Sequence, residues 1–90
     1  MARYNLLVSR QVDKFLNGLG ARTRRRIVSE LRDLENFPLF NNRHDMAELK
    51  GHRDYYRLRT GDIRTIFKID KQEKMIYVEK MERRESAYEK

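Results

Sequence analysis

The spacing of apolar residues changes once along this chain, near residue 45, and the change restricts the folds available to it. Between residues 11 and 36, apolar positions recur as on one face of an α-helix. From residue 46 onward they alternate with polar residues, as in strands with one buried face. Helices followed by strands predict an α+β domain in which two antiparallel helices pack on one face of a mostly antiparallel sheet.

Residue types at the segment ends set the boundaries of the expected elements. Ser9 is suited to cap a helix, which Gly18 and Gly20 are expected to end by adopting positive φ. Pro38 ends the second helix, because the residue before a proline avoids the α region. Thr60-Gly61 predicts a two-residue turn. The expected elements are a strand at 3–8, helices at 11–19 and 21–36, a loop at 39–45, and strands at 46–50, 54–59, 62–69 and 75–81, giving a sheet of four to five strands in the order strand, helix, helix, then three or four strands.

The charge of the chain favours a polyanionic partner. Its 90 residues are expected to form a single domain over 1–90 with one modest core. Lysine and arginine number 21 against 14 aspartates and glutamates, a formal charge of +7. Such an excess favours nucleic acid or an acidic protein as partner, although a merely soluble surface would carry the same charge.

Several classes of chemistry are excluded or disfavoured by composition. There is no cysteine, which excludes disulfides, thiolate catalysis and cysteine-based zinc sites. His44 and His52 lack the spacing of a ligand pair, so neither a metal nor a cofactor is expected. No signal peptide or long apolar run is recognised, so we expect a soluble, cytoplasmic protein without membrane association.

Alternation along the strands gathers basic residues on one face of the sheet. Tyr55, Arg57 and Arg59 share a face, and Arg64 and Lys68 share a face of the next strand. With Thr60-Gly61 as the turn, Arg57 is expected opposite Arg64, where like charges destabilise the sheet. A bound phosphate would offset this cost, because guanidinium groups bind phosphate through paired hydrogen bonds. The alternative is a solvated face that Glu79 or Asp62 neutralises.

Several segments follow one another in an order found in a known family. They are the helix pair ending at Phe37-Pro38, Leu49-Lys50-Gly51, Tyr56-Arg57-Leu58-Arg59, Gly61-Asp62-Ile63-Arg64-Thr65-Ile66-Phe67, Met75-Ile76-Tyr77-Val78, and Arg83-Arg84 ahead of Tyr88. Together they cover nearly the whole chain, and they resemble the RelE/ParE toxin superfamily, in particular its RelE-type mRNA interferase branch.

The resemblance implies a metal-independent endoribonuclease, the toxin of a toxin–antitoxin system. Such a protein cleaves mRNA in the ribosomal A site by attack of a 2′-OH on the adjacent phosphate, and a cognate antitoxin neutralises it. Its expected partners are therefore the antitoxin, the ribosome and mRNA. Two alternatives stay open, a ParE-like inhibitor of DNA gyrase and a catalytically inactive RNA-binding relative.

The resemblance also assigns roles to five residues. Arg57 and Arg59 match a pair of basic strand residues that are lysines in the best-studied members, and Arg64 matches the phosphate-stabilising arginine. Arg84 and Tyr88 match the C-terminal arginine and tyrosine, with Arg83 as the rival of Arg84. Because a guanidinium does not lose its proton near neutral pH, Arg57 cannot be the general base. Tyr88 is the better candidate, since nearby arginines are expected to lower the pKa of its phenol.

A second set of residues is expected to contact RNA outside the reacting centre. Tyr55 is suited to stack on a base or to pack under Arg57, and Tyr77 carries the same alternatives. Four arginines open the second helix, an unfavourable end for cations. This placement suggests contact with ribosomal RNA phosphates, and a solvated charged face of the helix is an equal alternative. The expected RNA-binding residues are Lys50, Tyr55, Lys68, Arg83, Arg22, Arg25 and Arg26.

Overall fold

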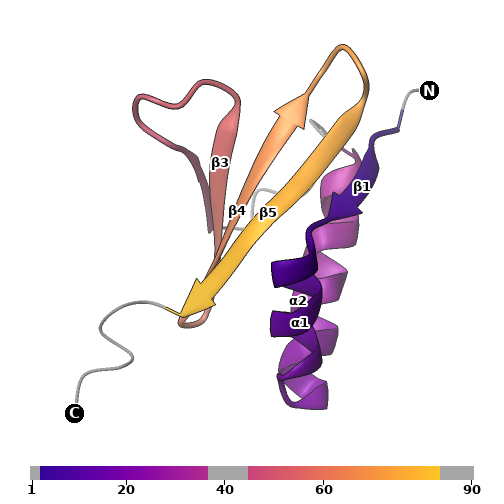
Figure 1. Ribbon diagram of the computed structural model, residues 1–90, viewed down its shortest axis with the longest axis vertical. Coiled ribbons are helices and arrows are strands. Elements are labelled where there is room, and N and C mark those ends of the chain that lie inside the picture. Colours follow the sequence, from indigo (N-terminus) through magenta and orange to yellow (C-terminus); the bar gives the residue numbers. More distant parts are fainter. Residues whose placement is uncertain (1–2, 37–44, 84–90) are drawn as a thin grey trace.

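The two helices of the protein lie together on one face of a five-stranded sheet (Figure 1). The computed structural model describes residues 3–36 and 45–83. The sheet order is β1-β5-β4-β3-β2, with β1 parallel to β5 and the other neighbours antiparallel. The predicted fold class is confirmed. The elements are β1 (Asn5–Val8), α1 (Arg10–Asn17), α2 (Ala21–Asp33), a 3-10 turn (Leu34–Asn36), β2 (Asp45–Glu48), β3 (Tyr55–Thr60), β4 (Ile63–Asp70) and β5 (Met75–Arg83).

The hydrophobic core lies between the helix pair and the sheet. Val12 of α1 and Ile27 of α2 are fully buried, as are Leu58 and Phe67 on the central strands. Tyr56 packs against Phe67, with ring centroids 5.7 Å apart. One face of the sheet is therefore committed to the core. Among the described residues, no helix has the length and apolar content needed to cross a membrane.

The ends of α1 are set by two different devices. Ser9 caps the helix as predicted, because its hydroxyl accepts a hydrogen bond from the Val12 amide at 3.2 Å. The predicted positive φ at Gly18 and Gly20 is wrong, since their φ values are −88° and −64°. The chain instead leaves α1 through a tight last turn, in which the Gly18 amide bonds to the Phe15 carbonyl at 3.1 Å. Gly20, in an extended conformation, then precedes α2.

The boundaries after α2 are described only in part. The helix ends at Asp33 and continues as the 3-10 turn through Asn36, which agrees with the predicted end near residue 36. Pro38 and most of the predicted loop at 39–45 lie outside the described residues. Asp45, which was assigned to that loop, is the first residue of β2.

The hairpin between β3 and β4 has a different register from the predicted one. Its turn consists of Gly61 and Asp62, with Gly61 at φ 63°, and Thr60 pairs with Ile63. Arg59 therefore lies opposite Arg64, which corrects the prediction that Arg57 does. Moving a turn by one residue shifts the pairing by two, so every side chain keeps its predicted face.

A bulge in β5 keeps the far side of the sheet in phase with β4. Ile66 pairs with Lys80, but Phe67 pairs with Val78, so Glu79 is the extra residue. Without this extra residue, the residues of β5 on one side of the bulge would point to the wrong face. The bulge thus allows one strand to supply core residues and exposed polar residues along its whole length.

Candidate anion-binding face of the sheet

The face of the sheet that is turned away from the helices is basic. We call it the open face, and its residues are defined by cross-strand pairing, since directly opposed residues share a face. Along β4 the burial alternates, with Arg64, Ile66 and Lys68 less buried than their neighbours. The open face comprises Asp45, Ala47, Tyr55, Arg57, Arg59, Arg64, Ile66, Lys68, Tyr77, Lys80 and Glu82.

One cross-strand row carries two arginines between two carboxylates. Asp45 of β2 lies opposite Arg59 of β3, Arg59 lies opposite Arg64 of β4, and Arg64 lies opposite Glu82 of β5. We call these four residues the arginine row. The two guanidinium groups in the centre are a like-charged pair, an arrangement that costs stability in a sheet. The row is therefore a site where an added anion would be favourable.

Arg64 is held by a carboxylate on the neighbouring strand. Its Nε donates to Glu82 Oε2 at 3.0 Å, and its Nη2 makes a second short contact with the same oxygen. Lys80 Nζ lies 3.4 Å from the other carboxylate oxygen. The hydrogen bond from Arg64 is the main reason that the pKa of Glu82 lies below its usual value, against the opposing effect of partial burial. Glu82 thus orients Arg64 and remains charged at neutral pH.

Arg59 is the available guanidinium of the open face. Asp45, although opposite Arg59, contacts Arg57 instead, with Nη1 and Oδ1 3.3 Å apart. Arg57 is also the more buried of the two, at 21% side-chain exposure. Within residues 3–36 and 45–83, the exposed side chain of Arg59 makes no hydrogen bond or ion pair. A phosphate approaching the row would meet the Arg59 guanidinium, which no described residue pairs with, and the half-exposed Arg64 beside it.

The carboxylates that balance the arginines are not the expected ones. Asp62 lies in the hairpin turn, where it pairs with Arg83 at 3.3 Å. Glu79 accepts a hydrogen bond from the Tyr55 hydroxyl at 3.4 Å. Asp45 and Glu82 take the predicted roles of these two residues, because the true register brings them beside the arginines.

A second cross-strand row on the open face combines tyrosines with a lysine. Tyr55 lies opposite Lys68, and Lys68 lies opposite Tyr77. We call these three residues the tyrosine row. Lys68 Nζ is 5.8 Å from the centre of the Tyr55 ring, within cation–π range. The row lies four residues along the strands from the arginine row.

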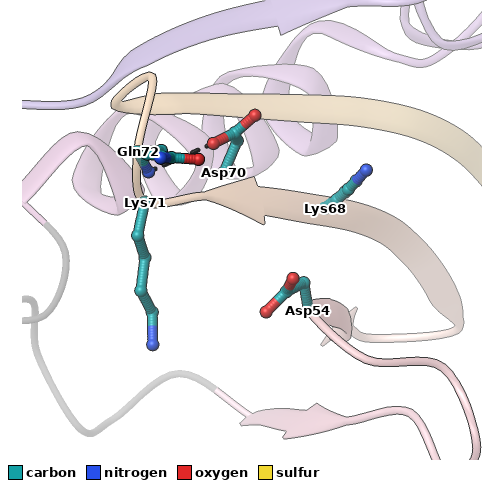
Figure 2. A pocket seen from close by; sticks show the side chains of 5 residues that line it. All are labelled: Asp54, Lys68, Asp70, Lys71 and Gln72. Carbon is teal, nitrogen blue, oxygen red and sulfur yellow. Dashed lines mark hydrogen bonds between the residues drawn. The ribbon is translucent and has the colours of Figure 1, made fainter.

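A polar pocket opens at the same end of the sheet. It has a volume of about 460 Å³, and Lys68 belongs to its lining. Figure 2 shows Asp54, which precedes β3, across the pocket from Asp70 and Lys71 at the end of β4. The Asp70 carboxylate accepts a hydrogen bond from the backbone N–H of Gln72 at 3.1 Å, and this bond shapes the turn before β5. The lining therefore contains positively and negatively charged side chains that can form hydrogen bonds.

Tyr56, the neighbour of Tyr55, belongs to the other side of the sheet. Its partial burial raises the pKa of the phenol, and the charges of Glu48 and Asp54 raise it further. A phenol with a raised pKa stays protonated at neutral pH, so Tyr56 is unsuited to act as a base.

The remaining predicted site residues lie away from the two rows or outside the described residues. Lys50 is exposed in the turn between β2 and β3, at the end of the sheet where Tyr55 begins its strand. Arg83 ends β5 and contacts the hairpin turn through Asp62. Arg84 and Tyr88 lie outside the described residues. Arg22, Arg25 and Arg26 are exposed on α2, in the helical layer, and Arg26 lies 3.7 Å from Glu30.

Sequence reasoning missed three charged residues of the open face. Asp45 was placed in a loop, and Glu82 lies beyond the predicted end of the last strand at residue 81. Lys80 had no assigned role. The alternation along β5 could have revealed Lys80 and Glu82, because both continue the polar positions of this strand past its bulge.

Together, the open face and its helical backing define a small basic α+β protein whose sheet presents a cationic face suited to a polyanion. Within the described residues, no group of three potential metal-ligating side chains occurs. The groups that this face offers for charge stabilisation are guanidinium and ammonium groups, those of Arg57, Arg59, Arg64 and Lys68.

Comparisons with known proteins place the chain in a family. No protein-family model matches it. A chain of the archaeal RelE–RelB complex from Pyrococcus horikoshii matches with 31% identity and a TM-score of 0.80, over 91% of this chain and 96% of that one. The RelB–RelE complex from Methanococcus jannaschii (24%, TM-score 0.74, 92% and 95% covered) and the isolated E. coli RelE toxin (18%, TM-score 0.74, 91% and 85% covered) share the fold. The chain belongs to the RelE branch of the RelE/ParE toxin superfamily.

Proposed function

We propose that this protein is a ribosome-dependent endoribonuclease, the toxin of a toxin–antitoxin system, and that it cleaves mRNA in the ribosomal A site. The observation that carries the proposal is the arginine row, where Arg59 and Arg64 oppose each other and Arg59 has no partner among the described residues. Two neighbouring guanidinium groups repel each other and destabilise a sheet that has no anion bound. The same two groups can stabilise a phosphate that gains negative charge in the transition state.

In the proposed reaction, a ribose 2′ oxygen attacks the adjacent phosphorus while the bond to the 5′ oxygen breaks. The products are a 2′,3′-cyclic phosphate and a free 5′ hydroxyl. Arg59 and Arg64 stabilise the phosphoryl oxygens, and Arg57 supports them from two residues away on the same face of β3. The reaction also requires a base for the 2′ proton and a proton for the departing oxygen. We assign the base to Tyr88 and further phosphate contact to Arg84.

The ribosome has a physical role in this proposal. The cations of the open face stabilise charge but do not hold a flexible mRNA strand in line for attack, so we expect the free protein to be a poor catalyst. Holding the mRNA strand in line for attack lowers the entropic part of the barrier by several kcal/mol, about 7–11 in favourable cases. A partner that orients the substrate thus supplies a part of the rate enhancement that the free protein lacks.

A cognate antitoxin is the second proposed partner. Matching chains in solved structures come from RelE–RelB complexes of Pyrococcus horikoshii and Methanococcus jannaschii. The excess of cations on this chain favours an antitoxin segment with acidic residues. We expect co-expression of that antitoxin to abolish toxicity.

The test of the proposed function is mRNA cleavage on translating ribosomes. Purified protein is added with a defined mRNA, and cut positions are mapped by primer extension beside an Arg64→Ala, Tyr88→Phe double variant. Cuts in the A-site codon that the double variant does not make would support the proposal. Intact mRNA would contradict it, and a gyrase supercoiling assay on the same samples would then test the ParE-like alternative.

A further inference from the structure

We propose that the tyrosine row is a nucleobase-stacking subsite, in which Tyr55, Lys68 and Tyr77 hold a base of the same RNA strand whose phosphate occupies the arginine row. This inference rests on the proposed function for the identity of the strand. It adds a second recognition element to the open face, one that binds a base where the arginine row binds a phosphate.

The chemistry of the tyrosine row differs from that of the arginine row. No residue of the row is acidic, and in the described part of the chain Lys68 has no carboxylate within ion-pair distance. Its ammonium group instead lies over the Tyr55 ring. Aromatic rings that alternate with cations are typical of surfaces that bind single-stranded nucleic acid, because bases stack on the rings while cations attract the backbone.

The Tyr55 ring is held in place from two sides. Its hydroxyl donates to Glu79 Oε2 at 3.4 Å, and the His52 ring meets it edge-on with centroids 6.4 Å apart. Glu79 is available for this contact because it is the extra residue of the β5 bulge. A ring fixed in this way offers a stacking surface at little cost in side-chain entropy.

The row continues into an apolar margin on β1. Leu7 lies beside Tyr77 in the parallel register and is 56% exposed. An exposed leucine next to a tyrosine on an otherwise charged face is unfavourable in water, and a stacked base would cover part of this surface. The polar pocket on the other side, with Asp54 and Gln72 in its lining, offers hydrogen bonds to the edge of a base (Figure 2).

The separation of the two rows fits a short strand of RNA. Tyr55 and Arg59 are four residues apart on β3, or about 13 Å at the rise of an extended strand. This distance spans about four nucleotides of a stacked strand at about 3.4 Å each, and fewer of an extended one. The base in the tyrosine row would thus lie a few nucleotides from the phosphate in the arginine row.

An acidic peptide is the other class of partner that a lysine between two tyrosines could attract. The pocket and Arg59, whose side chain has no partner in the described part of the chain, favour RNA, because the same face offers a phosphate site and groups for a base edge. The experiment therefore measures the stacking of a nucleobase, which an acidic peptide does not contain.

The experiment uses 2′-O-methyl oligonucleotides of about ten nucleotides, a length within the range of single-strand binding sites. The 2′-O-methyl group prevents cleavage, so binding is measured whether or not the protein is a nuclease. The fluorescent base 2-aminopurine, which stacking quenches, is moved through each position in turn. We expect one position, or two adjacent ones, to be quenched on binding.

Variants of Tyr55 decide the assignment. Tyr55→Phe keeps the ring and should retain the quenching, whereas Tyr55→Leu keeps only the apolar bulk and should abolish it and weaken binding by about tenfold. Lys68→Gln should weaken binding, whereas Lys14→Gln on α1, which removes the same charge from the helical layer, should bind as the unmodified protein does. Replacing the quenched base by an abasic residue should weaken oligonucleotide binding by the unmodified protein but not by Tyr55→Leu.

Four outcomes would overturn the subsite. The first three are the absence of any RNA binding, binding without quenching at any position, and quenching that Tyr55→Leu leaves unchanged. The fourth is that Tyr55→Leu weakens the binding of an acidic peptide but not the binding of RNA. Quenching that depends on Tyr55, in a protein that fails to cut mRNA on ribosomes, would support the subsite and contradict only the nuclease function.

Discussion

Arg59 and Arg64 lie directly opposite each other on neighbouring strands, and this pair connects stability with function. Asp45 and Glu82 flank the pair but contact Arg57 and Arg64, so Arg59 carries an uncompensated charge among the described residues. A residue that only served the fold would be expected to reduce this repulsion. Removing the Arg59 charge should therefore raise the stability of the protein and lower its activity.

The variant Arg59→Gln tests this conflict. We expect its free energy of unfolding to rise by about 0.2–1 kcal/mol, because a like-charged cross-strand pair is removed. Cleavage should fall by about 10²–10³-fold, the usual effect of removing one group that stabilises transition-state charge. Urea unfolding and cleavage on ribosomes measure the two effects. Arg57→Gln, which breaks an ion pair, should not stabilise the protein, and a loss of stability in Arg59→Gln would show that Arg59 has a structural role.

Glu82 makes stability depend on pH in a defined direction. The hydrogen bond from Arg64 holds its pKa below the ordinary 4.5, so its contribution to stability is complete above pH 4.5 and is lost as the pH falls further. At pH 7 we expect Glu82→Gln to be less stable than the unmodified protein by about 0.5–1 kcal/mol. The difference should shrink below pH 4.5. Urea titrations across this range measure it.

The exposed Glu73 provides the matched control for that titration. Glu73→Gln removes the same charge from the turn before β5, without a contact to an arginine. Its stability should stay close to that of the unmodified protein at both pH values. If Glu82→Gln lost equal stability at acidic and neutral pH, the ion pair with Arg64 would not be the cause.

At the scale of elements, features set by local sequence signals were predicted correctly, whereas the geometry of the turns was not. Ser9 was correctly identified as a cap because its hydroxyl acts within one turn. The β3–β4 turn was misplaced by one residue, since both Thr60-Gly61 and Gly61-Asp62 contain the glycine that such a turn requires. Only the pairing of both strands decides between the two. Gly18 and Gly20 were misread for a related reason, because a glycine permits positive φ without requiring it.

Paired alanine substitutions test the different roles of the glycines. Gly61 is at φ 63°, where a side chain is strained, so Gly61→Ala should lower the free energy of unfolding by about 1–2 kcal/mol. Gly18 is at φ −88°, and an added Cβ would lie an ordinary 3.6 Å from the Phe15 carbonyl oxygen. Gly18→Ala should therefore be neutral or stabilise by about 0.4–1 kcal/mol. Equal effects in thermal unfolding would contradict the assigned turn.

At the scale of the whole molecule, the layers and the basic face follow from the sequence, while the details of the site do not. Alternation in β3 and β4 placed Tyr55, Arg57, Arg59, Arg64 and Lys68 on one face, and an error of two in register could not change that. The parallel pairing of β1 with β5 and the bulge at Glu79 depend on contacts between distant segments. Which carboxylate contacts which arginine depends on the same pairing of distant segments.

The central claim is that the scissile phosphate binds the open face of the sheet. The most direct measurement is the single-turnover rate of mRNA cleavage on ribosomes programmed with one A-site codon. It compares Arg59→Gln, Arg64→Gln with Arg10→Gln, Lys14→Gln, which removes the same charge from α1 in the helical layer. We predict that the open-face variant loses at least about 10³-fold in rate, while the α1 variant stays within about twofold, as expected for a distant screened charge. Equal losses in the two variants, or full activity without Arg59 and Arg64, would contradict the account.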